Sequence, residues 1–180
     1  MALKPTIYKV ELQLSDFNRD CYDNVGLTVA LHPSETPERM LIRLIAFGLH
    51  YCSDLSFSRG LSATDEADLW ERSPSGEILQ WIEVGQASPE RIRKAVSLAK
   101  SVSLYSYGDS LDLWWEKEAA SFQALPRTTV WALRWAQKYD FGGFLERKMA
   151  ITLTISDDDI YVHSEGEQLT LKRKLLAGVS

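Results

Sequence analysis

Residues 65–100, DEADLWERSPSGEILQWIEVGQASPERIRKAVSLAK, carry the signals that decide the fold. Within them, residues 73–76 (SPSG) have the composition of a tight turn, and the apolar runs on either side predict strands over 68–72 and 78–84. Residues 88–90 (SPE) predict a helix start, because serine caps free amides and proline is tolerated in the first turn. The stretch is therefore expected to form strand, turn, strand and helix, which is typical of a mixed α/β unit.

The strand predicted over 78–84 is apolar on both faces. Ile82 lies on one face and Trp81 on the other, a pattern typical of a central strand covered on both sides. Glu83 shares the face of Trp81, where an unpaired carboxylate would be costly. We therefore expect Glu83 to be paired, hydrogen-bonded or bound to a metal ion.

The two ends of the chain predict antiparallel strands. Apolar and polar residues alternate over residues 5–31 and again over 145–172, with turn residues between the alternating runs. We expect the hairpin of 5–31 and the meander of 145–172 to pack together and close a sheet. Residues 172–180 are expected to fray, as chain ends usually do. Between the two ends, helical patterns predict helices over 37–50, 88–100, 110–122 and 133–139, and apolar runs predict strands over 102–107 and 128–132.

Composition narrows the class of protein. The 180 residues are 45% hydrophobic, which suits a single domain over 1–180 with a proper core. No apolar run reaches the roughly 18 residues of a membrane span, the first residues lack a signal-peptide core, and two cysteines exclude a disulfide framework or a zinc cluster. We expect a cytoplasmic protein with no membrane partner. The net charge of −5 disfavours a protein that coats duplex nucleic acid.

Asp68 and Glu83 are the strongest candidates for a functional site. The tight turn between their strands lets the two carboxylates converge, and such a pair repels unless a cation or a proton lies between them. Hard oxygen ligands suit Mg²⁺ or Mn²⁺, and a lysine or arginine from helix 88–100 could stabilise charge during metal-assisted hydrolysis. The alternative is a surface hairpin whose charges are simply solvated.

Other polar residues have simpler interpretations. Glu38 projects towards the edge of the apolar face of helix 37–50, where the helix dipole favours a carboxylate, and a cap-region role is equally open. His32 and His50 are expected to be hydrogen-bonded structural histidines. Trp114 and Trp115 are expected in the core, and residues 157–159 (DDD) in a turn.

A group of motifs resembles the bacterial YaeQ family over essentially the whole chain. The motifs are MALKPTIYK at 1–9, HPSET at 32–36, ERM at 38–40, RGL at 59–61, DE at 65–66, WIEVG at 81–85 and RIRKA at 91–95. The resemblance implies a cytoplasmic protein with a variant of the PD-(D/E)xK restriction-endonuclease-like fold. Its nuclease-like core would span about 34–108, with the hairpin and the meander added from the two ends.

The resemblance also implies roles for single residues. Asp68 and Glu83 would be the metal ligands, and the helix glutamate would be Glu38, with Glu35 as the alternative. Gly85 stands where these nucleases have a lysine. Lys94 of the following helix would replace that lysine, and Arg91 is the competing candidate.

Two hypotheses about function follow. The first is a Mg²⁺-dependent phosphodiesterase or nuclease, with Asp68 and Glu83 as metal ligands, Glu38 as an auxiliary ligand or base, and Lys94 or Arg91 stabilising charge. The alternative is a non-catalytic binding or regulatory protein that retains the nuclease-like fold and engages a nucleic-acid or protein partner. The sequence leaves the oligomeric state open.

Overall fold

The computed structural model describes residues 3–59 and 65–179. These residues form ten strands and four helices, with all the strands in one mixed sheet. Residues 1–2, 60–64 and 180, which include parts of the MALKPTIYK and RGL motifs, lie outside the described residues. In chain order the elements are β1 (Thr6–Asp16), β2 (Cys21–Leu31), α1 (Pro37–Leu49), β3 (Leu55–Phe57), β4 (Leu69–Arg72), β5 (Ile78–Val84), α2 (Pro89–Leu98), β6 (Ala99–Ser106), α3 (Leu111–Gln123), β7 (Thr128–Trp135), α4 (Phe141–Phe144), β8 (Lys148–Ser156), β9 (Asp159–Ser164) and β10 (Glu167–Ala177).

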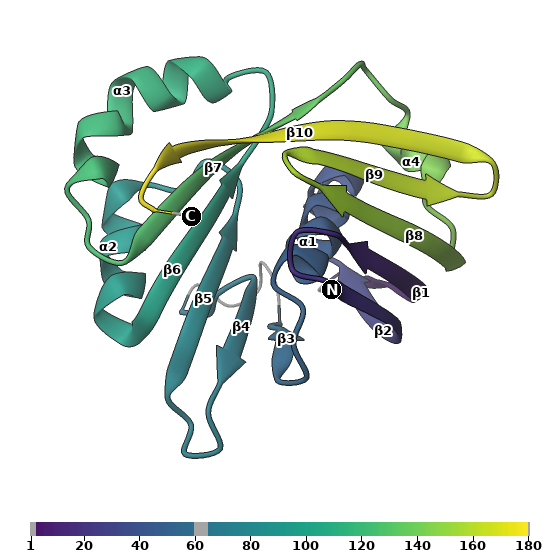
Figure 1. The fold of residues 1–180 in the computed structure, drawn as a ribbon, viewed down its shortest axis with the longest axis horizontal. Helices are drawn as coiled ribbons and strands as arrows, with labels where there is room; N and C mark the ends of the chain where they lie inside the picture. The colour runs from purple at the N-terminus through teal and green to yellow at the C-terminus, as the bar shows by residue number, and fades with distance from the viewer. Residues whose placement is uncertain (1–2, 60–64, 180) are drawn as a thin grey trace.

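The sheet has the strand order β2-β1-β8-β9-β10-β7-β6-β5-β4-β3 and curves until it nearly closes into a barrel (Figure 1). In the described chain, β1 runs parallel to β8, and β5, β6 and β7 run parallel to one another. The other neighbouring strands are antiparallel. α1 lies within the curve, whereas α2 and α3 lie outside it (Figure 1). The predicted α/β class with a mixed sheet is thus confirmed.

α1 is the centre of the inner core. It begins after Thr36, whose hydroxyl accepts a hydrogen bond from the Arg39 amide at 3.2 Å. Residues 40–49 are all buried, as expected of a helix that is apolar on nearly every side. Gly48 allows α1 to approach the sheet closely, because a Cβ atom there would lie 2.1 Å from Cδ2 of Leu153 on β8.

α2 covers the outer side of the sheet. Ile92, Ala95 and Val96 are buried in a second core that also contains Trp81 from β5. Ile82, the next residue of β5, belongs instead to the inner core around α1. The prediction that β5 is covered on both faces is therefore confirmed.

The two ends of the chain contact each other as predicted. β1 and β2 form an antiparallel hairpin, and β8, β9 and β10 form an antiparallel meander. The hairpin joins the meander through the parallel pair of β1 and β8. At its other side, β10 pairs with β7, so the meander links the hairpin to the central parallel strands.

Two predictions for the last third of the chain are wrong. The helix expected over 133–139 does not form, because Leu133 and Trp135 continue β7 and pair with Arg173 and Leu171 of β10. The end expected to fray from residue 172 instead continues β10 as far as Ala177. In both places, the ladder between β7 and β10 overrides the local signal.

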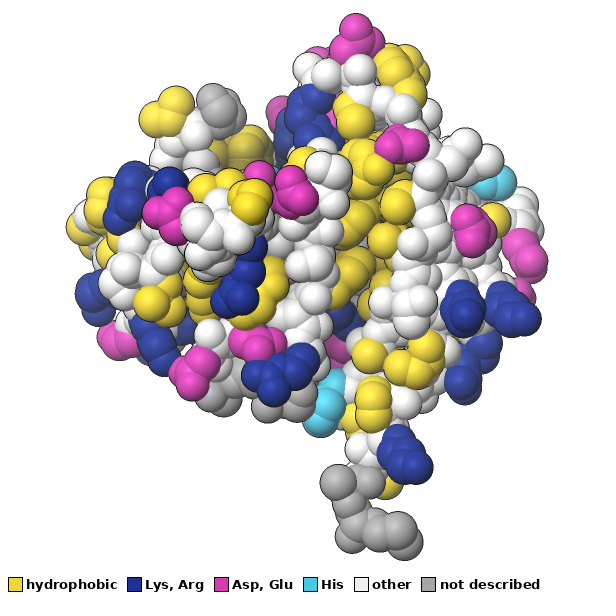
Figure 2. Space-filling model, turned by 90° about the horizontal axis from the view of Figure 1, so that it is seen from below, with side chains coloured by type: hydrophobic (Ala, Val, Ile, Leu, Met, Phe, Trp, Pro, Cys, Tyr) yellow, Lys and Arg dark blue, Asp and Glu magenta, His cyan; other side chains and the backbone are white. Residues whose placement is uncertain are grey.

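The lower face of the molecule shows a band of apolar side chains in a furrow between two more polar walls (Figure 2). The strand order leaves β2 and β3 as the two edges of the sheet, which explains why its closure is incomplete. Among the helices of residues 3–59 and 65–179, none has the length and apolar character needed to cross a membrane.

Candidate functional site

The candidate site lies where strands β5, β6 and β7 end. Because these strands are parallel, their carboxyl ends meet at one edge of the sheet, which is where open α/β sheets usually bind ligands. β5 is followed by Gly85 at φ +112° and β6 is followed shortly by Gly108 at φ +98°, both in the region that favours glycine. The chain therefore turns sharply at this edge.

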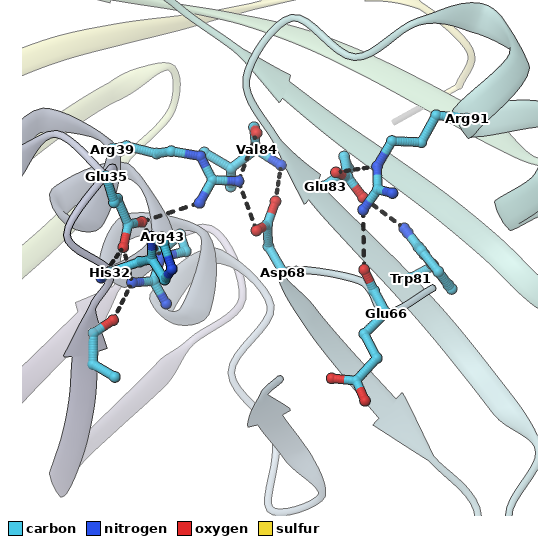
Figure 3. Close-up of polar contacts among 11 residues, drawn as sticks. His32, Glu35, Arg39, Arg43, Glu66, Asp68, Trp81, Glu83, Val84 and Arg91 are labelled. Atoms are coloured by element: carbon cyan, nitrogen blue, oxygen red, sulfur yellow. Dashed lines mark hydrogen bonds and ion pairs between the residues drawn. The ribbon is translucent and has the colours of Figure 1, made fainter. Parts of the chain in front are cut away.

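Asp68 is clamped against the end of β5. Its Oδ1 accepts a hydrogen bond from Nη2 of Arg39 at 2.7 Å, and its Oδ2 accepts one from the Val84 amide at 2.8 Å (Figure 3). The Asp68 amide donates in turn to the Ile82 carbonyl at 3.1 Å. With only 4% of its surface exposed, Asp68 has both carboxylate oxygens engaged by protein donors.

Glu83 is engaged in the same way on the outer face of β5. Its Oε1 accepts from Nε of Arg91 at 2.6 Å, and its Oε2 accepts from the Trp81 indole at 2.9 Å (Figure 3). Arg91 also donates to the Glu66 carbonyl at 3.0 Å. Burial raises the pKa of the Glu83 carboxyl, and the nearby charge of Asp68 adds to the rise, while Arg91 and Trp81 oppose it.

A chain of ion pairs connects Asp68 to the interior. Glu35 accepts from Nη1 of Arg39 at 3.0 Å and from Nε and Nη2 of Arg43 at 2.7 and 2.8 Å. Although burial alone lowers the pKa of the Arg39 guanidinium, the charges of Asp68 and Glu35 raise it above its usual range. Arg39 and Arg43 were not among the predicted site residues. Their spacing from Glu35, four and eight positions along the chain, was the available signal.

The remaining predicted residues lie apart from the acid pair. Lys94 forms a surface ion pair with Asp65 at 2.5 Å, and its side chain is 57% exposed. Glu38 accepts a hydrogen bond from the Trp135 indole at 2.8 Å. Burial raises the pKa of the Glu38 carboxyl, the Trp135 hydrogen bond opposes the rise, and the charge of Asp109 adds to it. The structure thus brings Asp68, Glu83 and Arg91 to one place, and Glu38 to a neighbouring one.

Glu38 lines a cleft of about 620 Å³ beside the ends of β6 and β7. We call it the Glu38 cleft, and the residues that line it include Glu38, Asp109, Arg134, Trp135, Lys138, Tyr139 and Phe141. The three aromatic rings contact one another, with the centroid of Trp135 lying 4.8 Å from that of Phe141 and 5.8 Å from that of Tyr139. The rings are inclined to one another at 47–78°, so the cleft combines a cluster of tilted aromatic rings with side chains of both charges.

The acid pair does not fit Mg²⁺ or Mn²⁺ in this arrangement, because all four of its carboxylate oxygens already accept protein hydrogen bonds. Within the described ranges 3–59 and 65–179, no group of three or more His, Cys, Asp or Glu side chains could hold a metal ion. The lysine position at Gly85 has open space around it, but φ of +112° would strain any side chain placed there.

The other predictions for polar residues have mixed outcomes. His50 is a hydrogen-bonded histidine, with Nε2 2.7 Å from the Tyr105 hydroxyl and Nδ1 2.8 Å from the Gln80 amide. Residues 157–158 form the turn between β8 and β9, as predicted. Trp114 and Trp115 pack against the outer core but stay partly exposed.

Comparisons with known proteins agree on one family. A family model described as YaeQ protein matches residues 1–173. The Salmonella typhi protein named "Uncharacterized protein YaeQ" is 36% identical over 173 residues, covering 96% of each chain. The Escherichia coli K12 protein of the same name is 36% identical over 170 residues, covering 94% of each chain.

Two crystal structures are similar over nearly their full length. The YaeQ protein from Xanthomonas axonopodis pv. citri matches with a TM-score of 0.91 at 34% identity, covering 97% of this chain and 99% of that one. The YaeQ protein from Pseudomonas syringae matches with a TM-score of 0.87 at 33% identity, covering 97% of each chain. The chain therefore belongs to the YaeQ family.

Proposed function

We propose that this chain is a non-catalytic binding protein that retains a nuclease-like fold and engages nucleic acid at the carboxyl ends of β5, β6 and β7. The observation that carries the proposal is the saturation of the acid pair. Every carboxylate oxygen of Asp68 and Glu83 accepts an N–H from an arginine, a tryptophan or the backbone. The pair thus acts as a structural tie between α1, β4, β5 and α2.

Magnitudes support a structural role for this pair. Removing one partner of a buried ion pair costs about 3–5 kcal/mol, because the other charge is left uncompensated. An ion that bound both acids would have to replace the contact of Asp68 with Arg39 and that of Glu83 with Arg91.

The order of elements supports the relation to PD-(D/E)xK nucleases that the resemblance implies. α1 supplies Glu38, and Glu35 lies just before its N-cap. Asp68 directly precedes β4, and Glu83 lies at the end of the neighbouring strand β5. α2 and the parallel strand β6 then complete the unit. Gly85 replaces the lysine of the nuclease motif, whereas the order of helices and strands around it is retained. This combination favours binding over hydrolysis.

The Glu38 cleft supports nucleic acid as the partner. Exposed aromatic side chains stack on unpaired bases, and a nearby lysine contacts phosphate. Trp135, Tyr139 and Phe141 are partly exposed, and Lys138 is exposed beside them. The net charge of −5 favours contact with a few unpaired nucleotides over the coating of a duplex.

Fluorescence anisotropy with labelled single-stranded RNA and DNA tests this proposal, with EDTA present so that divalent metals play no part. We expect binding by the wild type and weaker binding by Lys138→Glu. The matched control is Lys148→Glu, which changes an exposed lysine on β8 by the same charge. Failure to bind any strand, or an equal loss in both variants, would overturn the proposal, and the first result would point to a protein partner.

Metal-dependent hydrolysis is the second candidate function. It is favoured by the burial of both carboxylates at neighbouring strand ends, close enough that the charge of Asp68 raises the pKa of Glu83. Mg²⁺ or Mn²⁺ would require Arg39 and Arg91 to release the two acids. The roles predicted for Glu38, Lys94 and Arg91 belong to this candidate.

A cleavage screen separates the two candidates. Structured and single-stranded DNA and RNA are incubated with Mg²⁺ or Mn²⁺, with Glu83→Ala as the blank and Glu83→Gln as a variant that retains the shape of the side chain. We expect no cleavage that depends on Glu83, and no difference between wild type and Asp68→Ala in calorimetry with either ion. Metal-dependent cleavage that both Glu83 variants lose would replace the binding proposal with the nuclease.

A further inference from the structure

We propose that the Glu38 cleft binds a guanine base that carries a phosphate, with the Glu38 carboxylate accepting hydrogen bonds from the amine edge of the base. This inference rests on the proposed function, because it names the part of the nucleic acid that the cleft recognises. The same chemistry occurs in a free guanosine nucleotide and in an unpaired guanosine of a strand.

The acceptor is held in place before any ligand arrives. The Trp135 indole donates to Oε1 of Glu38 at 2.8 Å, which fixes the carboxylate at the wall of the cleft. Its other oxygen, Oε2, receives no hydrogen bond from residues 3–59 or 65–179 and stays accessible to solvent. An acceptor fixed on one side and open on the other is suited to a ligand that brings donors.

Guanine is the base whose edge matches a carboxylate. Its ring N–H and its exocyclic amine point in the same direction, so they can donate side by side, one to the open Oε2 and one to the remaining lone pair of Oε1, which already accepts from Trp135. Adenine presents an unprotonated ring nitrogen at the corresponding place, and this nitrogen would face Glu38 as a second acceptor. A site built around hydrogen bonds rejects a ligand that leaves them unmade.

The aromatic wall supplies one ring face for the base to stack on, because its three rings are inclined to one another at 47–78°. The rings of Trp135 and Phe141 lie 4.8 Å apart between centroids, and Tyr139 contacts both of them. The Tyr139 hydroxyl accepts from the Thr170 amide at 3.1 Å, so this ring is tied to β10. A cleft of about 620 Å³ is within the range of roughly 300–1,000 Å³ that small-molecule sites occupy.

The opposite charge in the cleft accounts for the phosphate. Lys138 is exposed and forms no ion pair with any residue of the described chain, whereas the neighbouring Arg134 pairs with Asp112. A ligand that carried only an amine would leave Lys138 without a partner. A ligand that was only a phosphate would be repelled by the carboxylates of Glu38 and Asp109. A base joined to a phosphate gives each end of the cleft a group of suitable charge, and Asp109 is suited to the ribose hydroxyls.

Titration of the Trp fluorescence tests the inference, with GMP, IMP, AMP and guanosine as probes and EDTA present. IMP lacks the exocyclic amine, so we expect it to bind roughly ten- to a hundredfold more weakly than GMP, which is the value of a hydrogen bond to a charged group. AMP should bind more weakly still, and guanosine should lose the phosphate contribution that Lys138 provides.

Variants connect the preference to Glu38. Glu38→Gln is expected to bring the GMP and IMP affinities together, because an amide presents a donor where the carboxylate has an acceptor. Glu116→Gln, an exposed change on α3 outside the cleft, is the matched control and should retain the preference. Thermal unfolding of each variant checks that the fold is retained. Equal affinities of the wild type for GMP, IMP and AMP, or no binding at all, would overturn the inference.

A second set of probes separates the two sources of guanine and the two proposals. Single-stranded oligonucleotides that contain one guanosine are compared with the same strands containing inosine. Strand binding without a preference for guanosine leaves the proposed function standing and refutes the guanine site. GMP binding with no strand binding refutes the nucleic-acid function and leaves the guanine site standing, with a free nucleotide as its ligand.

Discussion

Replacing Arg39 with methionine tests the view that the acid pair is a structural tie. Arg39 lies at the centre of the ion-pair chain, where its Nη2 donates to Asp68 at 2.7 Å and its Nη1 donates to Glu35 at 3.0 Å. Its side chain is 14% exposed and that of Asp68 is 5% exposed. Methionine fills much of the same space but removes the Arg39 hydrogen bond. Within the described residues, the Val84 amide then remains as the donor to the Asp68 carboxylate.

The expected loss of stability is large because Asp68, unlike Glu35, loses its only arginine partner among the ion pairs of the described residues. Glu35 retains Arg43, whereas Asp68 becomes a buried charge without its cation, which costs about 3–5 kcal/mol. For a protein of this size, each kcal/mol lowers Tm by about 2–4 °C. We therefore expect Arg39→Met to lower Tm by roughly 6–20 °C.

Urea unfolding followed by circular dichroism measures the loss. The control is Arg93→Met, which removes an exposed arginine from α2 and should change the free energy of unfolding by no more than about 0.5 kcal/mol. Adding Asp68→Asn to Arg39→Met should recover much of the loss, because the uncompensated charge is removed together with its partner. If Arg39→Met is no more destabilising than Arg93→Met, the structural role assigned to the pair is refuted.

Three further predictions concern pH and backbone strain. Because the pKa of Glu83 is raised above its ordinary value of 4.5, the folded state holds the proton more tightly than the unfolded state. As the pH rises above 4.5 and through the raised pKa of Glu83, the free energy of unfolding of the wild type should therefore fall relative to that of Glu83→Gln. A difference between the two free energies that stays constant with pH in urea unfolding would contradict this. Burial lowers the pKa of His50 to about 4 from 6.5, so its contribution to stability is lost as the pH falls through that window. His50→Gln should flatten the dependence of stability on pH between these values, and an unchanged slope in thermal melts would show that the imidazole charges freely in the folded state. Gly85→Lys should destabilise by about 1–3 kcal/mol, because φ of +112° strains any side chain, and should not create metal-dependent cleavage. The control Gln123→Lys adds the same charge at an exposed position of α3, and equal stability of the two variants would argue against strain.

The sequence was informative where structure is governed by local patterns. The start of α2 was predicted from residues 88–90, because a capping serine and a proline in the first turn are local signals, and Ser88 does accept a hydrogen bond from the Arg91 amide. The same applies to β5, whose two apolar faces predicted a covered strand, and to the first hairpin, where alternation over residues 5–31 predicted the antiparallel pair of β1 and β2. Burial of Glu83 followed from the same alternation.

The candidate site was only half predictable. Asp68 and Glu83 were expected to converge, and the charge of Asp68 does raise the pKa of Glu83. Of the two candidate cations, Arg91 pairs with Glu83, whereas Lys94 pairs with Asp65 at the surface. Arg39, which reaches Asp68 from 29 positions away, was not among the candidates. Which cation meets which acid depends on how α1 packs into the curved sheet, and no local pattern records that distance.

The sequence by itself thus determined the individual elements between residues 65 and 100, because a turn, a cap and a hydrophobic period are local properties. The tertiary structure decided which of these elements meet. β10 converts a segment with helical signals into the end of β7, because paired backbone groups outweigh a weak local preference. The tertiary structure also pairs the carboxylates of Asp68 and Glu83 with arginines, because a buried charge needs a partner close in space, wherever that partner lies along the chain.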